Sequence, residues 1–539
     1  MSSPYQSQVL DHLGLVAAMY EELGIGEVID RAIPQDATKR TVSLGQAVKA
    51  MVLNGLGFVN QQLYLVPHFF HHKPTARLVG PGIEASHLND DVLGRTLEGL
   101  YTAGVTPLYS LIAAQAAARL ELPSRFAHLD TTSFHVDGRY NSAETPEETV
   151  VHITQGYSRD HRPDLNQVML ELIVEHQAGI PILMKPLSGN TNDSVAFGQV
   201  ITDHIQHLCT AHRVTYLVAD SALYNADNLT RLSESGVTWI TRVPATLSEA
   251  QAVLAQANAE KMTPLTDGYR YHEVSATYGG VPQRWVVVYS EARQAQVKRA
   301  VAQHVQAQSA AELKAFKTLC RTSFACAEDA QQALQSFTQG LQASRLEGGT
   351  VHTVVRYGKR GRPARATAAA QVQYGVQGAL ASSLAYHQAL REAKSCFILA
   401  TNECDTTVLP AGEVLSGYKK QSVAERGFRF LKDPSFLASS LYLKKPERIM
   451  ALLMVMTVCL LVYAALEYRI RQALQAHHET FPDQKSRPVQ TPTVRWVFHY
   501  FGGIHVLLGI GESPCVLNLN TQHQLLLRLL GPPYEALYS

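Results

Sequence analysis

Two strand-like segments, each leading to an aspartate, constrain the fold of this chain most strongly. The segment RFAHLDTTSFHVDG, residues 125–138, alternates Phe126, His128 and Asp130 with a second set of side chains and is rich in β-branched residues. That pattern predicts a strand with Asp130 at or near its end. A second segment, VTYLVAD, ends in Asp220 and runs into a helix-like stretch. Two strands that bring aspartates to the same edge of a sheet predict a site where carboxylates bind metal.

The bulk composition predicts a folded chain of roughly two to four domains, because 46% of its 539 residues are hydrophobic. Lys and Arg number 47 against 46 Asp and Glu, a formal charge of +1. The total charge therefore gives no support for nucleic-acid binding, and any such surface must be local. The seven cysteines are scattered and never spaced as CxxC. They predict reduced thiols in a cytoplasmic protein and no zinc site.

One apolar segment resembles a membrane span. Residues 449–466, IMALLMVMTVCLLVYAAL, reach the minimum of about 18 residues for a span, but charged residues flank the segment and it stands alone. We interpret it as a helix buried in the core of a large domain. The alternative, a membrane-attached protein, predicts that the purified chain requires detergent. No signal peptide is visible at the N-terminus.

The first 121 residues predict an all-helical domain. Ser43 is a good N-cap for the apolar pattern that follows it, and one of residues 89–91, Asn-Asp-Asp, is interpreted as another helix cap rather than as part of a metal site. Several short helices with polar connections suit a helix-turn-helix-like module that binds DNA ends. Ordinary helical packing produces the same pattern, so both interpretations stay open.

The segment after Asp130 predicts a mixed sheet. QVMLELIVEHQ and GIPILMKPL form a hairpin around Ala178 and Gly179, and helix, strand, helix and strand patterns follow up to residue 243. From 244 to 394 the character changes to a hairpin at Gly279 and Gly280 and long Ala- and Gln-rich stretches, which we interpret as an inserted α+β subdomain. There KRGRP, residues 359–363, resembles basic hooks that enter A·T-rich minor grooves; a plain basic turn is the alternative.

A third carboxylate lies in GYKKQSVAERGFRFLKDP, which has helix-forming composition. Tyr418, Glu425 and Lys432 are seven residues apart, and Gln421 and Arg429 lie four residues either side of Glu425. At ~100° per residue, all five share one face of a single helix. The surroundings are basic, which predicts a phosphate-binding surface; the basic residues are Lys419, Lys420, Arg426, Lys444, Lys445 and Arg448. A solvated helix face with salt bridges is the alternative.

These segments together resemble the DDE transposases of bacterial insertion sequences, in the group with a Tyr-Arg-Glu-Lys signature. The resemblance rests on DTTSFH around Asp130, ADSALY around Asp220, and Tyr-x2-Gln-x3-Glu-x6-Lys around Glu425. GYSRDHRPDLNQ and PLSGNTND are also similar to the segments that follow the first aspartate in that group. The resemblance covers nearly the whole chain.

The resemblance implies a ribonuclease-H-like catalytic domain in which Asp130, Asp220 and Glu425 are catalytic and bind two Mg²⁺ or Mn²⁺ ions. Two hard cations about 4 Å apart suit phosphodiester chemistry. It implies DNA contacts by Tyr418 and Lys432. Gln421 stands where the signature has Arg, and Arg426 or Arg429 would substitute for the missing charge. The full predicted DNA-binding set is Tyr418, Gln421, Arg426, Arg429 and Lys432.

The expected fold is α/β, with an N-terminal all-α domain, a ribonuclease-H-like mixed-sheet catalytic domain and an inserted α+β subdomain. The expected boundaries are 1–121 for the helical domain, 122–243 for the first part of the catalytic core, 244–394 for the insertion, and 395–539 for the second part of the core with the C-terminal helices. The implied partners are terminal inverted repeats and target DNA, bound by a homodimer in the cytoplasm at the nucleoid, without a membrane.

The expected activity is to cut the ends of an insertion sequence and to transfer the 3′-hydroxyl ends to target DNA. Two alternatives stay open: a metal-dependent DNA nuclease of the same fold without strand transfer, and an inactive DNA-binding remnant. In some relatives a Trp of the inserted subdomain stacks on a flipped base, a role that the resemblance extends to Trp285 or Trp239.

Overall fold

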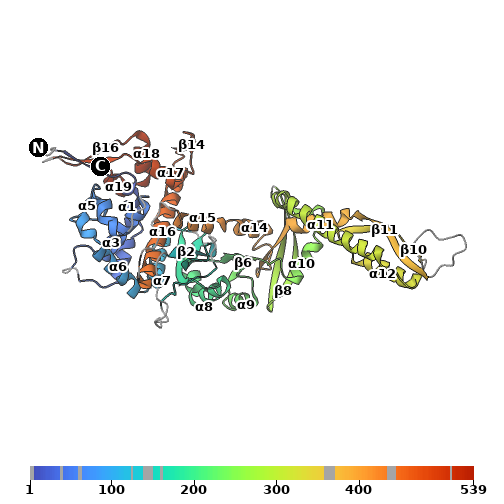
Figure 1. Ribbon diagram of the computed structural model, residues 1–539. Coiled ribbons are helices and arrows are strands. Elements are labelled where there is room, and N and C mark those ends of the chain that lie inside the picture. The colour runs from blue at the N-terminus through green and yellow to red at the C-terminus, as the bar shows by residue number, and fades with distance from the viewer. Residues whose placement is uncertain are drawn as a thin grey trace. The chain divides into compact units, whose positions relative to one another are not determined.

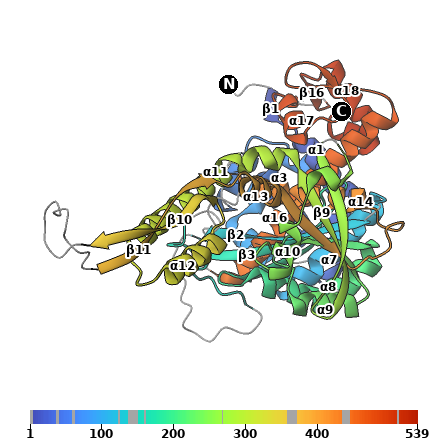
Figure 2. The same ribbon diagram turned by 90° about the vertical axis from the view of Figure 1, so that its right-hand side faces the viewer.

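The computed structural model describes most of the chain, as two compact units (Figures 1 and 2). Unit 1 comprises residues 1–241, 277–281 and 415–539, and unit 2 comprises residues 242–276 and 282–414. The described residues are 5–36, 40–58, 63–122, 125–136, 150–157, 162–266, 268–356, 371–433, 443, 445–509 and 513–539. The KRGRP segment lies outside them.

The sheet of unit 1 is mixed, as the sequence predicts. Its strands follow the order β4 (Pro181–Ser188), β3 (Asn166–Glu175), β2 (Phe126–Val136), β5 (Tyr216–Ala219) and β6 (Thr238–Arg242). The pairs β4–β3 and β3–β2 are antiparallel, whereas β2–β5 and β5–β6 are parallel. The predicted hairpin is confirmed, and its turn requires the glycine at 179, where φ is +73°.

Helices cover both faces of this sheet. On one face, α8 (Asp193–His212) packs Ala196 against Met169 and Leu187 of β3 and β4. On the other face, Leu170 and Leu172 of β3 join the main hydrophobic core, which also includes α15 (Ser422–Leu431) and α16 (Pro446–Ala476). The helix α9 (Ala226–Glu234) lies between β5 and β6 in the chain.

The apolar segment 449–466 is a core helix. It lies within α16, which packs against the N-terminal helices α1, α3, α6 and α7 (Figure 1). By length and composition α16 is able to cross a membrane, but 94% of its most apolar window is buried inside the molecule. The interpretation as a core helix is confirmed, and the core that α16 organises is shared by the N-terminal and C-terminal segments.

The N-terminal segment is helical, as predicted, with one short strand before the helices. Ser43 caps α3 through a full capping box with Gln46, and the side chain of Asn89 accepts a hydrogen bond from Val92 N to cap α6, so both predicted caps are confirmed. The elements are β1 (Tyr5–Val9), α1 (Leu13–Glu22), α2 (Ile25–Ala32), α3 (Leu44–Leu56), α4 (Val66–Phe70), α5 (Thr75–Leu78), α6 (Asp90–Thr102) and α7 (Val105–Arg119).

The C-terminal segment returns to this N-terminal part. The strand β15 (His505–Gly509) pairs antiparallel with β1, and the hydroxyl of Tyr538 donates to the carbonyl of Asp11 at 2.6 Å. The remaining elements after α16 are β13 (Phe481–Pro482), β14 (Pro488–Val489), α17 (Val494–Tyr500), β16 (Cys515–Leu517), α18 (Thr521–Leu530) and α19 (Pro532–Leu537).

Unit 2 combines strands with long helices. Its strands follow the order β12 (Cys396–Thr401), β9 (Val281–Ser290), β8 (Tyr269–Tyr278) and β7 (Thr263–Pro264), and a separate hairpin consists of β10 (Ser344–Arg356) and β11 (Gln371–Ser382). The predicted turn at Gly279 and Gly280, which joins β8 to β9 and is counted with unit 1, is present with positive φ at both. The helices are α10 (Ser248–Ala255), α11 (Glu291–Arg321), α12 (Ala327–Gly340) and α13 (Leu384–Ser395), followed by α14 (Ala411–Lys419) at the boundary with unit 1.

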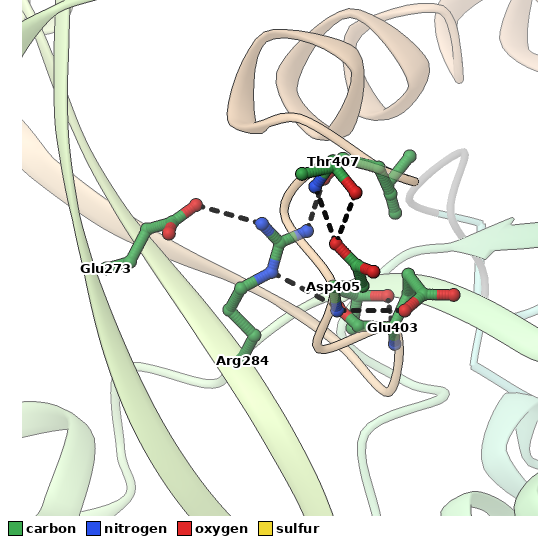
Figure 3. Close-up of polar contacts among 7 residues, drawn as sticks. Glu273, Arg284, Glu403, Asp405 and Thr407 are labelled. Carbon is green, nitrogen blue, oxygen red and sulfur yellow. Dashed lines mark hydrogen bonds and ion pairs between the residues drawn. The ribbon is translucent and has the colours of Figure 1, made fainter.

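Arg284 of β9 anchors the loop after β12. Its guanidinium donates to the carboxylate of Glu273 at 3.0 Å, to the carbonyl of Glu403 at 3.2 Å and to the carbonyl of Leu409 (Figure 3). Only 5% of Arg284 is exposed, so its charge is compensated inside the unit. This buried arginine therefore has a structural role.

Candidate active site

Asp130 and Asp220 lie next to each other on neighbouring strands. The parallel pairing of β2 with β5 runs from Phe126 and Tyr216 to Leu129 and Ala219, and the next residue in each segment is an aspartate, Asp130 within β2 and Asp220 directly after the end of β5. Directly adjacent residues of paired strands point to the same face, and neighbouring strands are about 4.8 Å apart. The stacked rings of Phe126 and Tyr216, whose centroids are 4.9 Å apart, mark the same face four residues earlier. The two carboxylates therefore share one small region of the sheet.

The position of Asp130 within its strand corrects the sequence prediction. Asp130 does not end β2, which continues to Val136, because β3 pairs with β2 without interruption from Ala127 to Val136. What ends at Leu129 is the parallel ladder with β5. Asp130 thus lies where β2 stops pairing with β5 but continues to pair with β3.

Backbone amides orient both carboxylates. Asp130 Oδ1 accepts a hydrogen bond from Thr131 N at 2.8 Å, and Asp220 Oδ1 accepts one from Ala222 N at 2.9 Å. The carbonyl of Asp220 also accepts from the hydroxyl of Thr241 on β6, at 2.6 Å. Asp130 is 8% exposed and Asp220 is half-buried. Hydrogen bonds of this kind stabilise the charged form of a carboxylate.

The helix that carries Glu425 covers the same face of the sheet. A Cβ atom on Gly417, at the end of α14, would lie 3.2 Å from the ring of Phe126. At the other end, the ammonium of Lys432 lies 6.0 Å from the ring centroid of Phe134. Because Phe126, Asp130 and Phe134 alternate along one face of β2, α15 passes over the stretch of β2 that contains Asp130. It packs there on β2, β3 and α16.

The predicted single helix is broken into two. The helix α14 ends at Lys419 and α15 begins at Ser422, and in between Gln421 N donates to Tyr418 O and Val423 N donates to Lys420 O, three residues apart. Such i+3 bonds tighten the turn and change the direction of the axis. The stripe predicted for one helix is therefore wrong for Tyr418 and Gln421: Tyr418 belongs to α14, and Gln421 is 8% exposed at the N-terminus of α15.

Glu425 is exposed on α15, beside the buried Ala424. Within the ranges that the structure describes, no group of three or more His, Cys, Asp or Glu side chains lies close enough together to hold a metal ion. The structure thus brings Asp130 and Asp220 together and places Glu425 on the helix above them, without joining the three carboxylates into one cluster.

The basic residues near Glu425 fall into two groups. Arg426 and Arg429 are exposed on α15 and form no ion pair with any described residue. In contrast, Lys445 and Arg448 are both bound to Glu98 of α6, each at 2.9 Å. This second pair therefore joins α16 to the N-terminal helices. Of the other predicted basic residues, Lys419 and Lys420 are exposed just before α15, and Lys444 lies outside the described residues.

A histidine pair lies beside the aspartates. His128 Nε2 and His176 Nδ1 are 3.0 Å apart, and the two rings are stacked. Burial, His176 and the charge of Lys420 lower the pKa of His128 to about 3, and burial and Lys420 lower the pKa of His176 to about 4. Both rings are therefore neutral at pH 7. The period-two alternation puts His128 on the face of Asp130, but it does not identify His176 as the partner.

The tryptophans of the sequence analysis are core residues. Trp239 on β6 is 0% exposed, and Trp285 on β9 is 3% exposed with its indole N–H donating to Gln283 Oε1 at 3.1 Å. Neither ring is available to stack on a base, because each would first have to leave the interior.

Two protein families match parts of this chain. Residues 125–462 match the transposase DDE domain family, and residues 5–114 match DUF4277, a domain of unknown function. No curated protein matches the sequence. Among solved structures, the chain is similar to the piggyBac transposase in a synaptic complex with hairpin DNA; the TM-score is 0.38 and the identity 10%, covering 92% of this chain and 82% of that chain. Because residues 125–462, more than half of the chain, match the DDE domain, this chain belongs to the transposase DDE domain family.

Proposed function

We propose that this chain is a DNA transposase that cuts the ends of an insertion sequence and transfers the freed 3′-hydroxyl ends to target DNA. The observation that carries the proposal is the placement of Asp130 and Asp220 side by side where β2 and β5 separate. The order of antiparallel and parallel strands in unit 1 supports a ribonuclease-H-like catalytic domain. Membership in the transposase DDE domain family supports DNA as the substrate.

The two aspartates fit a hard divalent cation. Carboxylate oxygens are the ligands that Mg²⁺ and Mn²⁺ prefer, and both side chains are held by backbone amides. Glu425 is the third proposed ligand, and because it is exposed on α15, its side chain has room to turn toward the sheet. Bound there, two cations would neutralise the charge that develops on the attacking and leaving oxygens of a phosphodiester.

The side chains of α15 would position the DNA. Arg426 and Arg429 carry charges that no described carboxylate neutralises, so they are available to the phosphate oxygens that flank the scissile bond. Tyr418, Gln421 and Lys432 are the other proposed DNA contacts; Tyr418 lies in α14, whereas Gln421 is at the N-terminus of α15. Two inverted repeats require two equivalent active sites, which is why we propose a homodimer on DNA.

Substitution of the acids tests the proposal. With Mg²⁺ and duplexes that carry the element ends, Asp130→Asn, Asp220→Asn and Glu425→Gln should each lower the cleavage rate at least about 10³-fold while DNA binding persists. The matched control is Asp227→Asn, which removes an exposed acid in the first turn of α9 and should leave cleavage within about twofold. Cleavage retained by the Asp130 variant would refute the assignment.

A second assay separates transposition from simple hydrolysis. Pre-cut ends with a free 3′-hydroxyl and a plasmid target are supplied to the wild-type chain. A transposase joins the two molecules, whereas a metal-dependent nuclease of the same fold gives no joined product. Binding without any metal-dependent turnover would instead identify an inactive remnant.

A further inference from the structure

A pocket of about 270 Å³ in unit 2 is lined by two arginines, Arg242 and Arg293. Arg242 lies at the end of β6, and Arg293 lies in the first turn of α11. The apolar part of the wall comes from α10 and from the start of β12, including Phe397. Lys394, which is exposed, is also part of the lining.

The positive charges of the two guanidinium groups interact. Arg242 and Arg293 line the same pocket, and burial and the charge of Arg242 lower the pKa of Arg293. The guanidinium of Arg242 lies 5.7 Å from the ring centroid of Phe397, and Arg293 Nε donates to the carbonyl of Lys394 at 2.9 Å. These contacts hold the two side chains in place without neutralising either charge.

Neither arginine pairs with a carboxylate of the described residues. The titratable acid in the pocket lining is Cys396; burial and the nearby charge of Glu392 raise the pKa of its thiol to about 12, so the thiol is uncharged at pH 7. Arg284, the structural arginine of the same unit, differs in having an internal anion: it donates to the carboxylate of Glu273 and to two carbonyls (Figure 3). Two cations in one pocket that form no ion pair with a described carboxylate make a site for an external anion.

We propose that this arginine pocket, defined by Arg242 and Arg293, binds a phosphodiester group of the DNA backbone. A planar guanidinium matches two phosphate oxygens at once, and two of them supply the charge that a phosphodiester needs. The volume is below that of a typical pocket for a drug-sized ligand, about 300 Å³ or more, and so suits a small anionic group. The exposed Lys394 extends the positive charge onto the surface, as a polymeric backbone requires. This inference rests on the proposed function, because it takes DNA as the substrate.

Titration of labelled duplex DNA with the full-length chain at several salt concentrations tests the pocket. Arg242→Gln and Arg293→Gln should each weaken binding about tenfold and reduce the slope of log affinity against log salt by about 1. The DNA affinity of Arg242→Lys, which keeps the charge but loses the planar guanidinium, should lie between those of the wild type and Arg242→Gln. The matched control is Arg299→Gln on the exposed side of α11, and it should change affinity less than about twofold. Thermal unfolding midpoints confirm that each variant is folded.

The outcomes separate the pocket from the proposed function. An equal loss in the Arg299 control, or no loss in folded pocket variants, overturns the pocket. If inorganic phosphate raises the unfolding midpoint of the wild type but not of Arg242→Gln, while DNA affinity is the same in both, the pocket takes free phosphate and the assignment to DNA is overturned. A wild type that binds DNA through the pocket but neither cuts nor joins it leaves the pocket supported and the transposase function refuted. A wild type that binds no DNA refutes both.

Discussion

Asp130 and Glu171 lie on neighbouring strands but on opposite faces of the same sheet. Glu171 of β3 pairs with Thr131 of β2, the residue after Asp130, so the two acids are separated by little more than the thickness of the sheet. The side of Asp130 is covered by α15, whereas the side of Glu171 is covered by α8, where the hydroxyl of Thr131 donates to Asp193 at 2.7 Å. Their surroundings give the two carboxyl groups different chemistry.

Glu171 is 0% exposed, and both of its carboxyl oxygens are buried without a hydrogen-bond partner among the described residues. Burial raises the pKa of Glu171 to about 8; Lys185 opposes this shift and Asp193 adds to it. At pH 7 Glu171 is therefore mostly a neutral acid, which is a poor cation ligand, whereas Asp130, the proposed ligand, accepts a hydrogen bond from a backbone amide. The comparison teaches that the number of acids near a strand does not identify the site; their solvation does.

The largest expected effect is the contrast in activity between the two faces. Asp130→Asn removes a proposed metal ligand, whereas Glu171→Gln replaces a neutral acid by a neutral amide of nearly the same shape. At pH 7 the second variant should cleave DNA within about twofold of the wild type, so the two variants should differ by about 10³-fold or more. Comparable losses in both would break the distinction between the faces.

The next effect is on stability and depends on pH. Because the pKa of Glu171 is raised in the folded state, the unfolded chain loses this proton near pH 4.5 and the folded chain keeps it to about pH 8. The folded state binds more protons in that window, so wild-type stability falls as the pH rises through it, by at most about 1.4 kcal/mol for each pH unit.

The Glu171→Gln variant lacks this loss. Its thermal unfolding midpoint should equal that of the wild type near pH 4.5 and exceed it increasingly toward pH 8. Midpoints of the two proteins measured between pH 4.5 and 8 check the prediction, and parallel curves would show that Glu171 ionises normally in the folded state.

The smallest effect concerns the contact that holds α8 to β2. Thr131→Val removes the hydroxyl that donates to Asp193 and should lower the free energy of unfolding of unit 1 by about 1–2 kcal/mol. Thr131→Ser keeps the hydroxyl and is the control. Chemical unfolding followed by the fluorescence of Trp239 in unit 1, with the other tryptophans replaced, measures the difference; equal losses in Val and Ser variants would show that packing rather than the hydrogen bond matters.

Local features were predictable from the sequence because their causes are local. The caps at Ser43 and Asn89 and the turns at Gly179 and Gly279–Gly280 follow from hydrogen bonds and backbone angles within a few residues, and the structure confirms them. The core position of α16 was predictable from its charged flanks and marginal length.

Features that depend on distant partners were not predictable in the same way. The composition of residues 417–433 favours one helix, but the chain forms two, α14 and α15, with the break at Lys420 and Gln421. Lys445 and Arg448 look like a phosphate-binding surface until Glu98, about 350 positions earlier, is seen to bind them. Nothing in the local pattern identifies such a partner.

The sequence by itself determined that two strands carry Asp130 and Asp220 and that a basic helical segment carries Glu425, because alternation and composition are properties of short segments. Only the tertiary structure decided that the two aspartates are adjacent, that Glu425 is exposed above them, and that Glu171 is buried behind them. Strand pairing and solvent exclusion depend on residues far apart in the chain, and the solvent exclusion is what raises the pKa of Glu171.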